Sequence, residues 1–193
     1  MQARLEGSSE RGFNQRQAHF RLALIAHATG DMAEQAKQAR WILAALQDPP
    51  MPNVEELPEA LGELAIAQSR LTQTDAALAT AQRMETAARQ QLEVGSEMLS
   101  KHLARIAWVA LEAGQMERAL ALSNEALGIL PIADASWNRF AIRTAALVRL
   151  RALQQLGRSS EMADWAKLVA QQRKTATVDD AMLWKAAEPL LPR

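Results

Sequence analysis

Histidine is the side chain most often used for proton transfer and metal binding near neutral pH, and this chain has three, at positions 19, 27 and 102. None of them follows a glutamate by three residues, so the Glu-x-x-His pattern of di-iron helical bundles is absent. His19 and His27 lie eight residues apart and could share one face of a helix, but two neutral imidazoles without a nearby carboxylate make a poor metal site. We therefore expect no metal and no cofactor.

Motifs for nucleophilic catalysis and phosphate binding are also missing. The sequence has no cysteine, which excludes a cysteine nucleophile, a zinc–thiolate site and a disulfide scaffold. It contains no glycine-rich phosphate loop, no H-E-x-x-H and no G-x-S-x-G. The acidic pair Glu55-Glu56 precedes an expected helix, where negative charge stabilises the helix N-terminus without any catalysis. The sequence predicts that the protein is not an enzyme.

The charges of the chain are balanced, with 22 Lys and Arg against 22 Asp and Glu. There is no basic excess of the kind that favours direct binding to nucleic acid. Residues 1–15 lack the apolar core of a signal peptide, and no stretch approaches the roughly 20 apolar residues that span a membrane. We expect a cytoplasmic protein that binds neither nucleic acid nor a membrane.

The elements that must position any binding residues are helices. Ala and Leu dominate, Tyr is absent, and Val, Ile and Thr are sparse, which favours helices over strands. Glycine, proline and capping residues divide the chain into segments of helical length. The expected helix pairs are residues 14–47, 57–93, 96–130 and 136–173. Before them we expect a flexible segment, residues 1–13, and after them a C-terminal capping helix, residues 177–188.

The turns within these pairs recur at a nearly constant interval. They fall 42, 42 and 43 residues apart, at Gly30, Thr72, Gly114 and Gly157. A Leu or Ile followed by Ala precedes three of them at the same distance, at Leu22-Ala23, Leu64-Ala65 and Ile106-Ala107. A helix pair cannot bury its own apolar face, so neighbouring pairs must stack. The period predicts one all-α domain of four antiparallel pairs, residues 14–189, with a non-repetitive Ala-rich bundle as the alternative.

The third pair resembles a tetratricopeptide repeat. Residues 102–131 read HLARIAWVALEAGQMERALALSNEALGILP, and Ile106-Ala107, Gly114, the Ala-Leu pairs at 119 and 126, and Pro131 fall at the spacing of that family. The other three pairs match in part, and the period exceeds the ~34 residues of the standard repeat. Longer pairs of this kind resemble the tetratricopeptide-like domain of MalT-like bacterial transcriptional activators. The resemblance implies a right-handed α-solenoid that binds another molecule in its concave groove.

In tetratricopeptide arrays the first helix of each pair lines the groove. Carrying this register across the chain gives a mixed surface of apolar side chains and of arginines that can hold a carboxylate in bidentate fashion. The residues expected to contact a partner are Phe20, Arg21, Leu24, His27, Ile66, Arg70, Lys101, Arg105, Trp108, Glu112 and Arg151. Trp108 is the tryptophan that we expect in the groove, and most of the others should pack between helices.

The clamp with which chaperone-binding members of the family hold a terminal carboxylate is not matched. At its places stand Phe20, Leu24, Glu63, Lys101 and Arg105, and only the last two fit. Our hypothesis is a protein–protein interaction scaffold or regulatory module that binds a peptide or helix, within a larger bacterial signalling or transcriptional regulator. Two alternatives stay open: a sensor of a small effector or peptide, and a self-associating module that forms a homodimer through a terminal helix pair.

Overall fold

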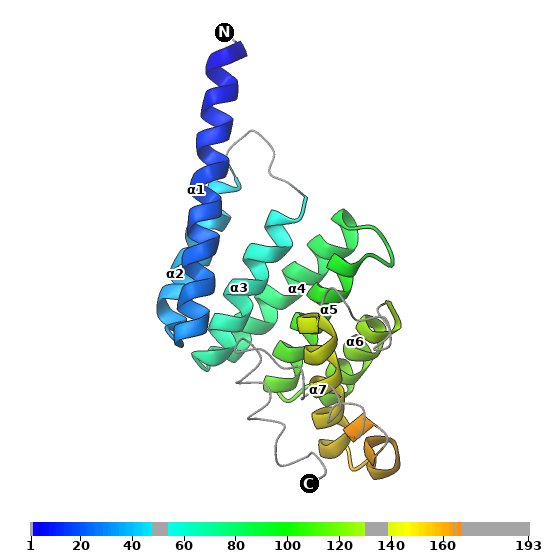
Figure 1. Cartoon of the computed structure of the whole chain (residues 1–193). Coiled ribbons are helices and arrows are strands. Elements are labelled where there is room, and N and C mark those ends of the chain that lie inside the picture. The colour runs from blue at the N-terminus through cyan, green and yellow to red at the C-terminus, as the bar shows by residue number, and fades with distance from the viewer. Residues whose placement is uncertain (1, 48–53, 130–138, 164, 167–193) are drawn as a thin grey trace. The chain divides into compact units, whose positions relative to one another are not determined.

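The computed structural model describes residues 2–47, 54–129, 139–163 and 165–166 (Figure 1). These residues form helices and turns, with no β-strand among them, so the predicted all-α class is confirmed for the described part of the chain. The helices are α1 (Gln2–Thr29), α2 (Met32–Ala45), α3 (Glu56–Arg70), α4 (Thr74–Gln91), α5 (Glu97–Glu112), α6 (Met116–Ile129) and α7 (Arg139–Gln155). Residues 159–163 and 165–166 are helical as well. The predicted capping helix, residues 177–188, lies outside the described residues.

Side chains that cap the first turn define where two of the helices begin. The Asp31 carboxylate accepts a hydrogen bond from the backbone N–H of Glu34 at 3.0 Å and starts α2. The Ser96 hydroxyl accepts one from the N–H of Leu99 at 3.2 Å and starts α5. Each bond satisfies an N–H group that has no partner within the helix, which is why short polar side chains stabilise helix starts.

The four predicted turns share one backbone geometry. Each has a left-handed residue, with φ of +78°, +57°, +78° and +70° at Gly30, Thr72, Gly114 and Gly157. At each turn the N–H of the following residue donates to the carbonyl five residues earlier, at 2.8 to 2.9 Å. The left-handed residue itself donates to the carbonyl three residues earlier, at 3.0 to 3.1 Å. This is the Schellman motif, and it recurs at the intervals of 42, 42 and 43 residues found in the sequence.

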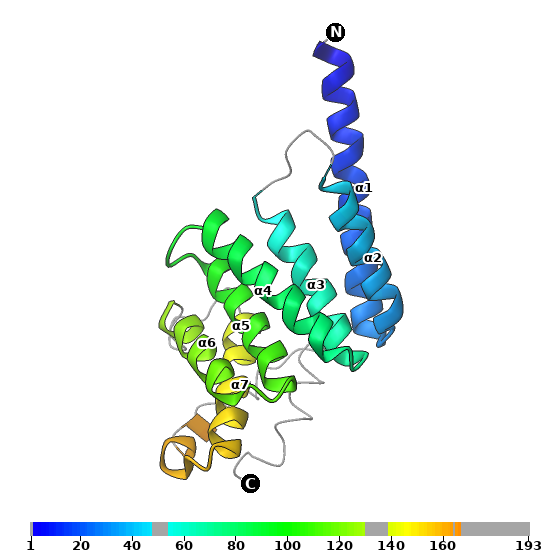
Figure 2. The same cartoon turned by 180° about the vertical axis from the view of Figure 1, so that it is seen from behind.

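The chain divides into two compact units, Met1–Gln91 and Leu92–Arg193, and the single repeat domain expected from the sequence stays a prediction. Each helix pair of a repeat array contacts mainly its neighbours, so such a chain can divide between pairs. In the first unit α1 packs on α2, α2 on α3 and α3 on α4 (Figure 2). Its core is built around small side chains, with Ala36, Ala39 and Ala67 around Leu64, and Phe20 against Ile42 and Ala60.

In the second unit α5 packs on both α6 and α7, and α6 also packs on α7. Helix α5 is buried from residue 99 to residue 111, except at the half-buried Lys101. Apolar side chains occur all round this stretch, and a helix of that kind belongs in an interior. The Ser100 hydroxyl donates to the carbonyl of Ala126 at 2.9 Å and so ties α5 to α6.

The N-terminal segment that the sequence predicted to be flexible, residues 1–13, is helical from Gln2 onward and continues into α1. The segment has no proline, and its Ala, Leu, Glu and Arg residues favour a helix strongly enough to include two glycines. With 28 residues α1 is twice as long as the 14-residue α2. Its first turns consequently extend past α2 and α3 (Figure 1).

Candidate functional site

Helix α1 carries large apolar side chains that are open to solvent. Phe13, Leu22, Leu24 and Ile25 keep 43%, 46%, 52% and 59% of their surface exposed. Leu22 and Ile25 are three residues apart, as neighbours on a helix surface are. Phe13 and Leu24 lie on another side of the helix from Leu22, so Leu22 and Ile25 form the contiguous pair, and contiguous exposed apolar residues mark an interaction site more often than isolated ones do. We call these four residues together with Arg21 the α1 surface.

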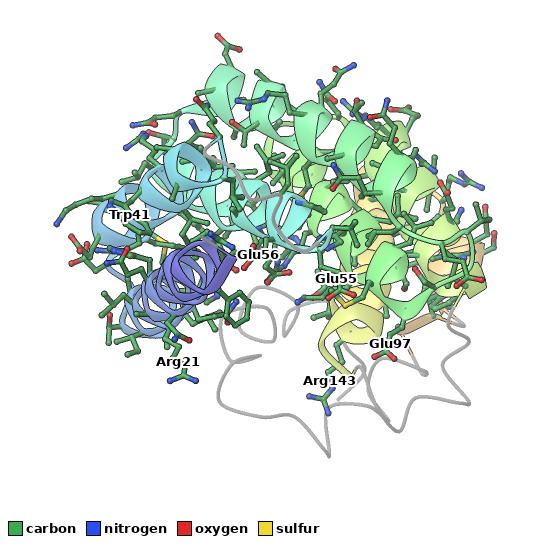
Figure 3. The ribbon with its side chains drawn as sticks, turned by 90° about the horizontal axis from the view of Figure 1, so that it is seen from above. Arg21, Trp41, Glu55, Glu56, Glu97 and Arg143 are labelled. Atoms are coloured by element: carbon green, nitrogen blue, oxygen red, sulfur yellow. The ribbon has the colours of Figure 1, made fainter. Side chains whose placement is uncertain are left out.

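Arg21 is the charged residue of the α1 surface. It is exposed and points away from α2 and α3 (Figure 3). A guanidinium with apolar neighbours on its own helix can hold a carboxylate of a partner with two parallel hydrogen bonds. The α1 surface therefore combines apolar contact area with one cationic group.

A chain of polar contacts holds α2 against α1. The His19 ring stacks on Trp41, with ring centroids 3.5 Å apart, and its Nδ1 is hydrogen bonded to the side-chain oxygen of Gln38. The Gln38 amide donates to Glu34 at 2.5 Å, and Lys37 Nζ lies 3.0 Å from the same carboxylate. These bonds from Gln38 and Lys37 lower the pKa of Glu34 below its ordinary value of 4.5. The contacts fix Trp41, which remains 38% exposed.

Buried polar contacts join the first three helices. Arg16 Nε donates to Glu56 Oε2 of α3 at 3.1 Å, and Gln17 donates to Glu56 Oε1 at 3.3 Å. Between α2 and α3, Gln35 Nε2 donates to Glu63 Oε2 at 2.7 Å. A carboxylate out of water needs such donors, so these bonds allow little rotation of α1 about its axis. They determine which residues of α1 reach solvent.

A separate open hollow of about 320 Å³ lies between α3 and α4. Its apolar part is formed by Leu57 and Leu61 of α3, one turn apart, and by Ala87 of α4. Its polar part comes from one face of α4, through Gln82, Arg83, Thr86, Gln90 and Gln91. The short side chains of Thr86 and Ala87 leave the space that a larger residue on this face would fill.

The structure distributes the eleven predicted contact residues over different environments. Four are buried, namely Phe20, Ile66, Arg105 and Trp108. Four are half-buried, namely His27, Arg70, Lys101 and Arg151. Arg21, Leu24 and Glu112 are exposed. Of the set, the structure joins Glu112 of α5 to Arg151 of α7 in an ion pair at 3.4 Å.

Trp108, expected to present its indole to a partner, is instead 3% exposed within the second unit. The expectation took the groove face of α5 to be open, whereas α5 is buried all round at this level. Arg105, one turn earlier on the same helix, is also buried, at 6%. Whether the exposed members of the set contact a partner stays a prediction.

The sequence did not single out Leu22 and Ile25 as candidate binding residues. The pair Leu22-Ala23 has counterparts at the matched place in the next two helix pairs, so Leu22 was interpreted as a packing residue. Ala23 is fully buried, but Leu22 is 46% exposed. The equivalent Leu64 and Ile106 are buried, because the helices that carry them lie deeper in their units. The apolar residues of α1 lie on several sides of the helix, which makes the helix weakly amphipathic. This pattern could have indicated that some of its apolar side chains stay exposed.

The remaining tryptophans differ in their surroundings. Trp41 is stacked on His19 between α1 and α2, and Trp165 is half-buried with the guanidinium of Arg149 4.1 Å from its ring centroid. Both contacts are with neighbouring helices or turns, as expected for amphipathic aromatic rings. Trp137 and Trp184 lie outside the described residues.

Within the described ranges no three His, Cys, Asp or Glu side chains gather in a way that could hold a metal ion. None of the described helices combines the length and the apolar character needed to cross a bilayer. Neither a protein-family model nor a curated protein matches the sequence.

Proposed function

We propose that this protein is a non-catalytic interaction module that binds a peptide or helix of a partner protein through the α1 surface. The observation that carries this proposal is the exposure of four large apolar side chains on one helix, at 43% to 59%. Burying such groups is favourable by about 25 cal/mol for each Å² of apolar surface removed from water. A partner that covers them supplies the burial that α2 and α3 do not.

The repeated turns support a tetratricopeptide-like array as the framework of this module. Four Schellman turns at intervals of 42, 42 and 43 residues give each pair the same reversal of chain direction. Arrays of this kind present side chains from successive first helices to a ligand. In the first unit those helices are α1 and α3, and α1 is the one that presents exposed apolar groups.

Site-specific photo-crosslinking in cells tests the proposal. A benzoyl-phenylalanine at Leu24 or at Ile25 should capture one discrete partner, whereas the same group at the exposed Ala79 of α4 should not. The purified partner should then lose affinity by about tenfold for the Ile25→Ser variant, because one buried aliphatic side chain is lost from the interface. Equal crosslinking at positions 25 and 79 would show that the α1 surface is not the docking site.

A second candidate function, self-association, is favoured by the spacing of residues along α1. Ala18, Leu22, Ile25 and Thr29 follow each other at intervals of four, three and four, which is the pattern of a helix–helix seam. All four are exposed. Sedimentation over a concentration series checks this: a dimer that dissociates in the Ile25→Glu variant supports it, and a monomer of 21.2 kDa throughout rules it out.

A further inference from the structure

The hollow between α3 and α4 is independent of the α1 surface and combines an apolar floor with hydrogen-bonding groups. Leu61 and Ala87 form much of the floor and are 1% and 6% exposed. Leu57, one turn before Leu61, is half-buried and borders the hollow. A floor of this kind favours an apolar side chain, because that side chain leaves water and lies against the apolar atoms of Leu57, Leu61 and Ala87.

Arg83 gives the hollow its charge. It is the one charged residue among the described residues of the lining, it is exposed, and it forms no ion pair with another described residue. The cation that follows on the same helix, Arg89, is by contrast paired with Glu85 at 3.1 Å. A guanidinium that pairs with no described carboxylate and lies beside an apolar floor is complementary to the carboxylate of a ligand.

Three glutamines complete the rim of the hollow. Gln82, Gln90 and Gln91 are exposed, and each amide offers two donors and one acceptor. Peptide groups need both donors and acceptors when they leave water, so a rim of this type suits an extended peptide backbone. Among the described residues that line the hollow, none is acidic and would repel a carboxylate.

The size and openness of the hollow indicate what kind of molecule it takes. About 320 Å³ is at the lower end of the range for small-molecule sites. Such sites enclose most of their ligand, whereas this hollow is open on one side. One large side chain can enter it while the rest of the molecule stays outside, which describes a residue of a longer peptide.

We propose that the hollow between α3 and α4 is a second binding site, which takes a peptide segment of a partner with a Leu-sized apolar residue next to Asp or Glu. The apolar side chain lies against Leu57, Leu61 and Ala87, the carboxylate pairs with Arg83, and the backbone bonds to the glutamine amides. This site goes beyond the proposed function, since it lies on α3 and α4 and uses no residue of the α1 surface.

Titrations of the full-length protein with blocked tetrapeptides, followed by NMR of the glutamine side-chain amides, test the site. The probes are acetyl-Ala-Leu-Glu-Ala-amide and its two variants, with Gln in place of Glu and with Ala in place of Leu. We expect a Kd on the order of 1 mM for the first peptide. The Gln and Ala peptides should each bind about tenfold more weakly, because one loses the charged hydrogen bond and the other loses the apolar contact.

Substitutions separate the two contacts. Arg83→Gln should abolish the preference for Glu over Gln while the preference for Leu over Ala remains. Ala87→Leu should fill the hollow and abolish binding of all three peptides. Arg83 is exposed, so Arg83→Gln should leave the packing of the helices unchanged. This variant therefore tests the proposal even if Ala87→Leu disturbs the packing of α4. Arg89→Gln, on the same helix but outside the hollow, is the matched control and should bind like the wild type.

Three results would overturn the proposal. The first is that the side-chain amides of Gln82, Gln90 and Gln91 stay unshifted at about 10 mM peptide, well above the expected Kd. The second is that Arg83→Gln leaves the preference for Glu unchanged. The third is that free N-acetyl-leucine, a small acid with the same groups, binds more tightly than the peptide. The Ile25→Ser variant should bind the peptides normally, so failure here and failure of the α1 surface can be told apart.

Discussion

Thr72 occupies the turn position that glycine occupies in the other three helix pairs. Its φ of +57° makes it the one non-glycine residue with positive φ among the described residues. The left-handed conformation costs a residue with a Cβ atom roughly 1–2 kcal/mol, and β-branching adds crowding. The turn nevertheless forms, because the Schellman hydrogen bonds and the packing of α3 on α4 determine the local backbone.

Replacing Thr72 with Gly should therefore stabilise the protein. We expect an increase of about 0.5–1 kcal/mol in the free energy of unfolding, since relief of strain exceeds the added entropy of the unfolded glycine. Thr86→Gly is the control, because Thr86 is an exposed residue inside α4, where glycine lowers stability. Urea unfolding of both variants provides the measurement, and a loss of stability in Thr72→Gly would contradict the strain.

Trp108 is a packing residue, and its replacement should act on stability. With 3% of its surface exposed, Trp108→Ala leaves a large cavity in the second unit. We expect a loss of about 3–5 kcal/mol. Arg21→Ala, at an exposed residue of the α1 surface, should change stability by less than about 0.5 kcal/mol. Thermal unfolding compares the two, and a Trp108→Ala protein as stable as Arg21→Ala would be incompatible with the burial of the indole.

The carboxylate of Glu34 makes the contact between α1 and α2 sensitive to acid. Hydrogen bonds from Gln38 and Lys37 lower the pKa of Glu34 in the folded protein below the ordinary 4.5. A lowered pKa contributes stability that is present above 4.5 and lost as the pH falls through the folded value. Wild type should thus be more stable than Glu34→Gln at about pH 6, and the difference should shrink as the pH falls below the ordinary 4.5 and through the lowered pKa of Glu34. A difference that stays the same as the pH falls would contradict this linkage.

At the scale of the elements, the buried ion pair of Arg16 and Glu56 connects α1 to α3. Its side chains are 11% and 5% exposed, so removal of one charge leaves the other desolvated. Arg16→Met keeps most of the apolar stem and should lower stability by about 3 kcal/mol. The double variant Arg16→Met with Glu56→Leu should recover part of that loss. A double-mutant cycle in urea measures the coupling, and strictly additive effects would refute it.

The α1 surface depends on how α1 is held by its neighbours. A helix with apolar residues on several sides can bury more than one of its faces. Arg16 and Gln17 bond to Glu56, and His19 contacts α2, so the side of α1 that carries Ala23 and Phe20 turns inward. Leu22, Leu24 and Ile25 then have no place in the core. The sequence contains these contacts only as residues far apart, and their pairing arises in the folded unit.

At the scale of the whole molecule, the helices should differ widely in their stability against local opening. The first turns of α1 extend past the shorter α2. A helical segment of only a few turns that packs on nothing is marginally stable in water. The α5 segment 99–111 is buried, except at the half-buried Lys101. In hydrogen exchange followed by mass spectrometry, we expect residues 2–11 to exchange within seconds and residues 99–111 to exchange last. Similar rates in both segments would contradict this order.

The sequence by itself determined the helical class, the positions of the four turns and most helix limits. These features depend on local properties: helix-forming composition, left-handed turn residues, and caps such as Asp31. It also placed Arg21 and Leu24 among the candidate binding residues, and both are exposed. The alignment of the helix pairs with a tetratricopeptide repeat did not predict the burial of each residue. A shared backbone pattern does not determine which helix faces are covered by neighbouring helices.

Tertiary structure alone decided which side chains reach solvent and which side chains meet. Trp108 and Leu22 were predicted on opposite grounds, one for binding and one for packing, and the structure buries the first and exposes the second. The hollow above Leu61 likewise needs α3 and α4 to pack with Thr86 and Ala87 facing it. Burial depends on contacts between residues distant in sequence, such as Arg16 with Glu56, and periodicity describes only neighbours along one helix.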